Sequence, residues 1–480
     1  MSVLFPPISL SSLRSWRTWE RKNASPWIAF LIGCVLVSCP IAHTGATEGR
    51  HSDEGVFNSD SDNSPTPDLD DSEDGGVDAS LPTLWNLERI GRLVPLSPEP
   101  MAAFFEALDS METDGEGLVR VLHYGDSHTA ADFITTAIRR SLQKRFGDGG
   151  RGFILLGKPW RSYMPKDVET SARGPWQMHR ILIAADPASL DGRYGLGGVA
   201  VDASVRAATT RVASIAGSGF GNKMSSVEVF YLEQPRGGSF TVKLDRRSKR
   251  TVNTSKKRVG SGFFRLEMDE GMHEVEIQLK GDGKVRLFGA VVENDGPGIV
   301  YDTLGINGAF FYTPLRWDAG LLAEQVEQRD PDLIVTMYGA NEADSRNLTP
   351  AKYALNVKKA LARLRAGAPE AACLLLGPTD RRMPVPPGEP SKLDFIIDVQ
   401  REVADEEGCG FIDLRGLMGG PGSHGLWVTR GLAQPDGIHL TVRGYNALGE
   451  MLVRQIFNAY KRHLEENDNP ERVDIDGSSN

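Results

Sequence analysis

Short apolar runs alternate with amphipathic stretches along this chain of 480 residues. Runs that are partly β-branched are predicted to be buried strands: 118–124, 333–338, 373–377 and 410–414. Apolar residues recur at helical spacing in the stretches 101–108, 130–146, 352–366, 393–406 and 445–456. Strands that alternate with helices predict a parallel sheet with helices on both faces. Ligand sites of such sheets lie beyond the carboxyl ends of the strands.

Residues 165–300 follow a repeat of two residues instead. Apolar and polar side chains alternate in four segments: Val227, Val229 and Tyr231; Phe264, Leu266 and Met268; Val275, Ile277 and Leu279; and Val285, Leu287 and Val291. Turn residues such as Gly281-Asp282-Gly283 separate the segments. This region is therefore predicted to be an antiparallel β-sandwich inserted into the α/β part of the chain.

The first residues have the pattern of an export signal. A positive region ends at Lys22, and the apolar run from Trp27 to Val37 is too short for a secure membrane span. Leu36-Val37-Ser38-Cys39 matches a bacterial lipoprotein signal, which predicts that Cys39 is lipidated and anchors the protein to a membrane. Signal cleavage near 42–46 and an uncleaved anchor are the alternatives. All three interpretations place the protein in the cell envelope or periplasm.

The net charge of −10 gives no reason to expect nucleic-acid binding. Residues 51–80 hold ten Asp or Glu and no Lys or Arg, which is typical of a solvated, disordered tether. The predicted organisation is a signal at 1–38, an acidic linker at 39–84, α/β parts at 85–164 and 301–465 around the β-sandwich at 165–300, and a polar tail at 466–480.

A serine stands where the first predicted strand turns into a helix. Gly125-Asp126 ends the strand, and Ser127 follows directly. A hydroxyl there stands clear of the sheet, near helix N–H groups that favour developing negative charge. Taken alone, this segment is better explained by Ser127 as a helix N-cap, because serine is a preferred residue at that position.

Asp436 and His439 supply the partners that a nucleophilic serine needs. They lie three residues apart at a turn, so the carboxylate of Asp436 can hold one ring nitrogen of His439. The other nitrogen is then free to take the proton of Ser127. An Asx turn from Asp436 is the simpler alternative.

Gly308 and Asn341 are candidate donors to an oxyanion. A glycine lets a backbone N–H approach a reacting oxygen closely. Asn341 follows the predicted strand 333–338, and its side-chain amide is a strong uncharged donor. With the N–H of Ser127, these groups predict an oxyanion hole with three donors. Each residue alone also fits an ordinary turn.

These segments resemble the four blocks of the SGNH (GDSL-like) hydrolase superfamily, which contribute Ser, Gly, Asn and His in that order. Ser127, Gly308, Asn341 and His439 match those positions, and Asp436 matches the third triad member. The stretches 124–133, 145–150 and 302–309 look more specifically like bacterial peptidoglycan O-acetylesterases. Glu342 stands where many members have Asp, which leaves the Asn341 donor intact.

The resemblance implies a three-layer α/β/α fold with a carbohydrate-binding-like β-sandwich. It also implies an exported serine esterase that removes O-acetyl groups from a cell-wall glycan through an acetyl-enzyme, with no cofactor or metal. A glycan O-acetyltransferase that uses the same acyl-enzyme is an alternative, and so is a non-catalytic glycan-binding lipoprotein. The oligomeric state stays open.

Substrate contacts are less well marked. His128 follows the nucleophile and is a candidate for substrate binding. The simpler alternative is that it is only a polar residue in the first turn of the helix. Trp176, Tyr194 and Phe220 are candidates for sugar contact because aromatic faces suit the apolar faces of sugars, although core packing is the simpler reading for each.

The cysteines point to no metal site. Cys373 begins one predicted strand and Cys409 precedes another, so they either pair or remain as two buried thiols. No cluster of Cys and His has the spacing of metal ligands.

Overall fold

The computed structural model describes residues 94–157, 159–160, 163, 165–182, 191–217, 219–383 and 391–467. All of them belong to one compact unit, Asp68–Asn480. The predicted signal, Cys39, the acidic linker and the last residues of the predicted tail lie outside the described residues. Within the described part, no helix is long and apolar enough to cross a membrane.

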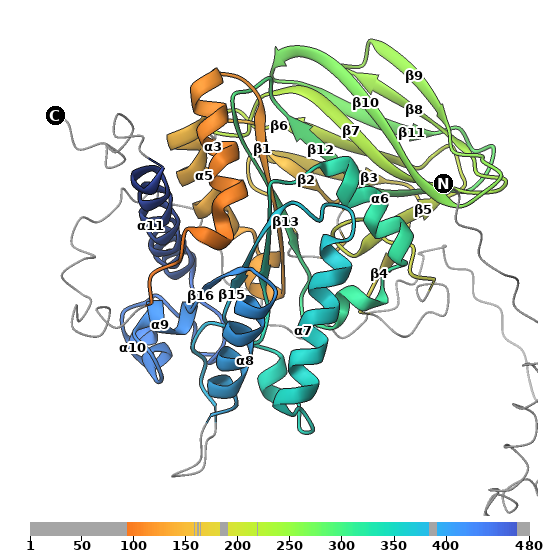
Figure 1. The fold of residues 1–480 in the computed structure, drawn as a ribbon. Helices are drawn as coiled ribbons and strands as arrows, with labels where there is room; N and C mark the ends of the chain where they lie inside the picture. Colours follow the sequence, from red (N-terminus) through yellow and green to blue (C-terminus); the bar gives the residue numbers. More distant parts are fainter. Residues whose placement is uncertain are drawn as a thin grey trace, which may run out of the picture. The chain divides into compact units, whose positions relative to one another are not determined.

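Five parallel strands form the central sheet (Figure 1). Their order is β13 (Gly298–Gly305), β1 (Leu118–Gly125), β14 (Leu333–Met337), β15 (Ala372–Leu376) and β16 (Gly410–Ile412). Four of these strands were predicted. β13 was missed because its apolar run is interrupted by Asp302, a fully buried carboxylate that pairs with Arg329. β16 is shorter than predicted because Asp413 caps the next helix.

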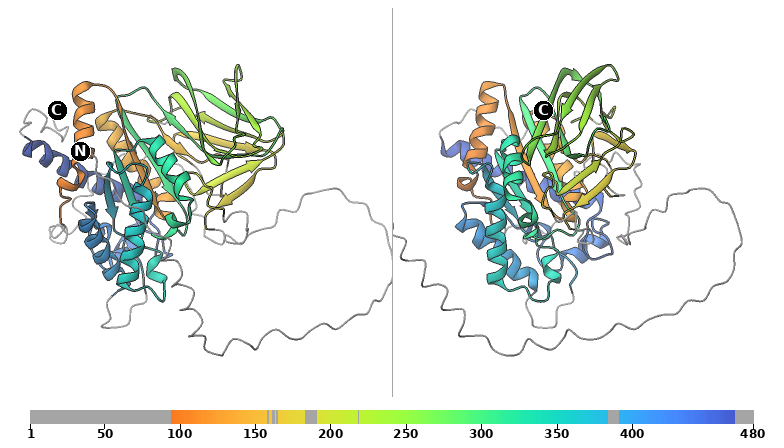
Figure 2. Two further views of the ribbon diagram at one scale, coloured as in Figure 1. Left: turned by 45° about the vertical axis from the view of Figure 1, so that its right-hand side comes forward. Right: turned by 90° about the vertical axis from the view of Figure 1, so that its right-hand side faces the viewer.

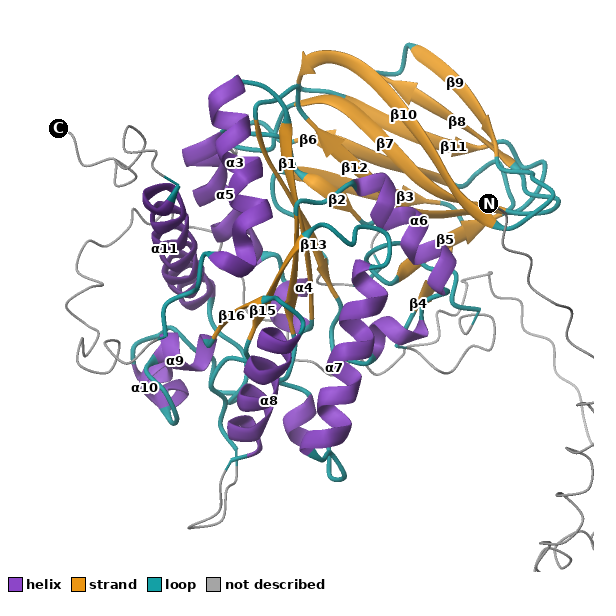
Figure 3. Ribbon diagram, in the orientation of Figure 1, coloured by secondary structure: helices purple, strands orange, loops and turns teal. Residues whose placement is uncertain are grey.

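Helices cover both faces of this sheet (Figure 3), which confirms the predicted α/β class. Side chains alternate between the faces, as strand geometry requires. In β1, Val119 and Val121 join one apolar cluster, whereas Leu122 and Tyr124 join the other.

The first cluster includes side chains from α3 (Ala102–Asp114), α5 (Phe133–Phe146), α9 (Leu414–Met418), α10 (Ser423–Thr429) and α11 (Val442–Glu466). The second includes side chains from α6 (Ala319–Arg329), α7 (Pro350–Arg365) and α8 (Lys392–Glu406). Among the described residues, the α/β part also contains the short elements η1 (Glu99–Met101), α4 (Ser127–Ala130), η3 (Thr313–Arg316) and η4 (Glu342–Asp344).

Two antiparallel sheets form the additional β-rich region, whose strands run from yellow to green in Figure 2. One sheet has the order β10 (Gly260–Gly271), β7 (Met224–Glu233), β12 (Val285–Glu293), β5 (Val199–Ala203) and β4 (Gln177–Arg180), with β2 (Gly152–Ile154) also paired to β12. The other has the order β3 (Val168–Arg173), β6 (Thr209–Ser214), β11 (Glu274–Leu279), β8 (Ser239–Leu244) and β9 (Ser248–Asn253). Apolar side chains of both sheets share one core.

A buried ionic cluster links this region to the parallel sheet. Arg329, at the end of α6, donates to Glu293 of β12 and to Asp302 of β13 at 2.8 Å each. Arg120 of β1 also pairs with Glu293 at 2.9 Å. Because buried charges are costly unless they are paired, these contacts favour a single docking of the two parts.

Cys373 and Cys409 form a disulfide, with 4.8 Å between their Cα atoms. It joins the start of β15 to the residue before β16. Of the two alternatives left open by the sequence, the structure therefore has the paired one.

Candidate active site

The register of the parallel sheet gathers three of the sequence blocks at one edge. Gly125 at the end of β1 is level with Gly305 of β13 and with Met337 of β14. Ser127, Gly308 and Asn341 lie two, three and four residues beyond these ends. The loops that carry the three residues therefore begin side by side at the carboxyl edge, where ligand sites of parallel sheets occur.

Ser127 is the first residue of the short helix α4, but it is not its N-cap. Asp126 holds that position and accepts a hydrogen bond from the N–H of His128 at 3.0 Å. A Cβ at Gly125 would overlap the side chain of Thr129, so only glycine permits this tight turn. Because Asp126 caps the helix, the hydroxyl of Ser127 is left for another partner.

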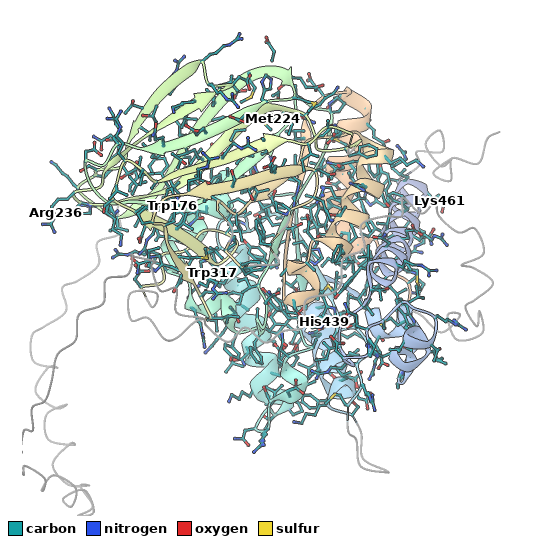
Figure 4. The ribbon with its side chains drawn as sticks, turned by 180° about the vertical axis from the view of Figure 1, so that it is seen from behind. Trp176, Met224, Arg236, Trp317, His439 and Lys461 are labelled. Atoms are coloured by element: carbon teal, nitrogen blue, oxygen red, sulfur yellow. A yellow bond between two sulfur atoms is a disulfide. The ribbon has the colours of Figure 1, made fainter. Side chains whose placement is uncertain are left out.

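That partner is His439, which is labelled in Figure 4 and whose Nε2 lies 2.9 Å from Ser127 Oγ. The other ring nitrogen, Nδ1, lies 2.7 Å from Asp436 Oδ2. A carboxylate only accepts hydrogen bonds, so Nδ1 carries the proton and Nε2 is free to accept from Ser127. The three side chains form one hydrogen-bonded chain.

Asp436 is held as an anion by its own turn. Burial would raise its pKa, but the N–H groups of Ile438 and His439, together with the His439 ring, bring the pKa below its ordinary value. Both N–H groups donate to Oδ1, at 2.8 and 2.9 Å. The turn is fixed further by Arg382, whose N–H donates to the carbonyl of Gly437 at 2.7 Å.

Gly308 and Asn341 are linked through the residue that follows Gly308. The side-chain amide of Asn341 donates to the carbonyl of Ala309 at 2.9 Å, which uses one of its two N–H groups. Gly308 is exposed and has a φ of +75°, a conformation that favours glycine. The second N–H of Asn341 and the N–H of Gly308 are the candidate donors to a bound oxygen.

Glu342 also holds the Gly308 segment, a role that was not predicted from the sequence. Its buried Oε1 accepts from the N–H of Phe311 at 2.5 Å. Burial raises the pKa of Glu342 to about 8, so the carboxyl is largely uncharged at neutral pH. Asn341 and Glu342 thus bind Ala309 and Phe311, on the chain just beyond Gly308. The position of Glu342 directly after Asn341 was the only available signal.

His128 is buried, and its ring lies next to that of His439. The two rings are 5.4 Å apart, and the nitrogens of His128 contact Tyr445 Oη at 3.0 Å and Thr379 Oγ1 at 3.4 Å. Burial, followed by the charge of His439, lowers the pKa of His128 to about 3. The neutral ring of His128 is therefore placed to support the ring of His439. Its burial disfavours direct contact with a substrate.

Of the candidate sugar-contact residues, Trp176 is not brought to this site. Trp176 is half-buried, packs on the β-sandwich core and donates to the carbonyl of Thr209 at 3.0 Å. Figure 4 shows it on the β-sandwich, well apart from His439. Tyr194 is buried in the core, and Phe220 is half-buried. Across the residues that the structure describes, no group of three or more His, Cys, Asp and Glu side chains is placed to hold a metal ion.

Known proteins share both the sequence pattern and the fold. Residues 274–447 match the model of the GDSL-like lipase/acylhydrolase family. A solved peptidoglycan O-acetylesterase is 25% identical, with a TM-score of 0.62 over 76% of this chain and 97% of its own.

Two further solved structures are less similar. A lipase/acylhydrolase from Enterococcus faecalis is 24% identical, with a TM-score of 0.27 over 33% of this chain and 76% of its own. A family two carbohydrate esterase from Cellvibrio japonicus is 11% identical, with a TM-score of 0.27 over 61% of this chain and 98% of its own. No curated protein matches the sequence. The family model and the first structure together support an SGNH (GDSL-like) hydrolase, a serine esterase that acts on carboxylic ester bonds.

Proposed function

We propose that this protein is an exported esterase that removes O-acetyl groups from a cell-wall glycan, with peptidoglycan as the preferred substrate. The observation that carries the proposal is the hydrogen-bonded chain from Ser127 through His439 to Asp436 at the carboxyl edge of the sheet. The substrate class is supported by the similarity to a peptidoglycan O-acetylesterase, which extends over 76% of this chain.

In the proposed reaction, Ser127 Oγ attacks the acetyl carbonyl carbon and His439 Nε2 takes the hydroxyl proton. Asp436 stabilises the imidazolium that forms. The N–H groups of Ser127, Gly308 and Asn341 stabilise the negative carbonyl oxygen. The bond to the sugar oxygen then breaks, and His439 returns its proton to that oxygen.

Water completes the cycle. It attacks the acetyl-serine, His439 takes one of its protons, and acetate leaves as Ser127 regains its hydrogen. The side chain of His439 is 37% exposed, so solvent can reach the general base.

Export and the lipid anchor at Cys39 are proposed from the sequence alone. Replacing Cys39 by Ala tests the anchor, because the lipidated protein should partition with membranes and the variant should not. Recovery of both forms in the same soluble fraction would contradict it.

The experiment that tests the enzymatic proposal measures acetate released from O-acetylated peptidoglycan and from 4-nitrophenyl acetate. It compares the wild type with Ser127→Ala, and uses Ser141→Ala as a matched control on helix α5. We expect release from both substrates by the wild type and the control, and none above background by Ser127→Ala. Release from the small ester alone would contradict the glycan assignment, and release by Ser127→Ala would contradict the serine mechanism.

A further inference from the structure

Two aromatic rings lie stacked and partly exposed just beyond the candidate oxyanion donors. The rings of Phe310 and Tyr312 have centroids 5.1 Å apart and planes 15° apart. Both side chains are half-buried, whereas Phe311 between them is buried and packs against Tyr338 and Tyr353. The buried Phe311 anchors the segment in the core and leaves the other two rings near the surface.

The turn that carries these rings is held in place by its own hydrogen bonds. Thr313 Oγ1 accepts from the N–H of Phe310 at 2.9 Å, and the carbonyl of Phe310 accepts from the N–H of Thr313 at 2.8 Å. The guanidinium of Arg316 lies 5.8 Å from the centre of the Tyr312 ring and donates to the carbonyl of Ile181 at 3.3 Å. The rings are therefore ordered before any ligand binds, which lowers the entropic cost of binding.

The stacked rings are close to the site along the chain and through hydrogen bonds. Phe310 follows Ala309, whose carbonyl accepts from the Asn341 side chain, and Gly308 precedes Ala309. The N–H of Phe311 is bound by Glu342. A ligand bound by the rings would therefore lie next to the chain segment that carries the N–H groups proposed to stabilise the reacting ester.

We propose that Phe310 and Tyr312 bind the apolar face of a sugar ring in the O-acetylated glycan and so orient its ester toward Ser127. This inference rests on the proposed function. Aromatic rings present large, rigid apolar surfaces, and the C–H face of a sugar is complementary to them. Within the described part of the chain, the hydroxyl of Tyr312 has no hydrogen bond assigned to it, so it is available to a sugar hydroxyl. The alternative ligand for these two rings is an acyl chain longer than acetyl.

The test compares kcat/KM for O-acetylated peptidoglycan with kcat/KM for 4-nitrophenyl acetate, using the full-length protein. Phe310→Ala and Tyr312→Ala remove one ring each, and Tyr312→Phe removes only the hydroxyl. Phe411→Ala is the matched control, because Phe411 is also half-buried and has an arginine over its ring, but it belongs to edge strand β16.

We expect each alanine variant to lower the ratio of glycan to small-ester kcat/KM by roughly tenfold, mainly through KM, because the lost stacking is uniform binding. Tyr312→Phe should lower it by about threefold. Phe411→Ala should leave the ratio unchanged.

Three outcomes of the comparison between variants would overturn the sugar-binding role. Unchanged ratios in both alanine variants would remove it while leaving the proposed function intact. Equal losses on both substrates would show that the rings only shape the Gly308 segment. A selective loss of activity on 4-nitrophenyl hexanoate would assign the rings to an acyl chain instead. Failure of the wild type itself to release acetate from the glycan would overturn the proposed function, and the sugar-binding role with it.

Discussion

Replacement of Glu342 by Ala tests whether this buried residue positions the Gly308 segment. The substitution removes the carboxyl oxygen that accepts from the N–H of Phe311 at 2.5 Å. Phe311 is buried, so water does not replace the acceptor without local rearrangement. A buried donor left unpaired costs about 1–3 kcal/mol, which is enough to displace the segment that carries Gly308.

The expected effect on catalysis follows from the donors at stake. Loss of one oxyanion donor typically lowers kcat by about 10²–10³-fold. Displacement of Gly308 removes one of the three proposed donors, so we expect Glu342→Ala to lower kcat by roughly 10²-fold. KM should change little, because the oxyanion exists only in the transition state.

The variant Glu342→Gln tests whether an uncharged acceptor is sufficient at this position. The pKa of Glu342 is raised to about 8, so at pH 7 the carboxyl is mainly uncharged and an amide of the same length can replace it. Its oxygen still accepts from Phe311, and we expect kcat within about threefold of the wild type. Glu342→Asp is one methylene shorter and should lie between the two.

The assay is steady-state hydrolysis of 4-nitrophenyl acetate at pH 7, with Tm measured for every variant. A Glu342→Ala protein that is folded and keeps kcat within twofold of the wild type would refute the positioning role. A Gln variant as slow as the Ala variant would refute the claim that an uncharged acceptor is sufficient.

The raised pKa of the Glu342 carboxyl predicts that the stability of the folded chain depends on pH. Burial raises its pKa from 4.5 to about 8, so between these values the folded chain keeps a proton that the unfolded chain has released. This contribution to stability is complete below about pH 4.5 and is lost as the pH rises to about 8. Glu342→Gln does not titrate, so its Tm relative to the wild type should increase across this window. A constant difference in Tm would contradict the raised pKa.

Three further predictions concern other parts of the molecule. Asp436→Asn should lower kcat by about 10³-fold or more, because the amide no longer fixes the tautomer of His439; steady-state kinetics measure this. Joint replacement of Cys373 and Cys409 by Ala should lower the free energy of unfolding by about 3–4 kcal/mol in denaturant titrations, since the disulfide closes a loop with a sequence separation of 36. Arg329→Met should cost about 3–5 kcal/mol in the same titrations, because it removes the cation paired with the buried Asp302 and one of the cations paired with the buried Glu293.

Each of these predictions has a clear contrary result. Full activity of Asp436→Asn would remove the carboxylate from the proposed mechanism. The disulfide lies toward the amino ends of its strands, away from the carboxyl edge, so its removal should leave kcat unchanged. An unchanged unfolding free energy for Arg329→Met would mean that the buried ionic cluster contributes nothing to the docking of the β-sandwich.

The sequence by itself determined the elements that local periodicity encodes. Four parallel strands, the helices α3, α5, α7, α8 and α11, and four strands of the β-rich region (β7, β10, β11 and β12) were predicted from apolar repeats. The order of the polar residues at the strand ends also predicted which chemistry to look for. These inferences succeeded because burial on one or both faces imposes a repeat of 2 or 3.6 residues on the sequence itself.

Only the tertiary structure decided which polar groups meet. β13 was hidden because the charge of Asp302 is neutralised by Arg329, which lies on a different element. The role of Glu342 depends on Phe311, and the support of His439 by the buried His128 also depends on chain segments far apart in sequence. Such contacts leave no periodic mark, because a hydrogen bond between distant segments depends on sheet register and packing and not on the spacing of residues along the chain.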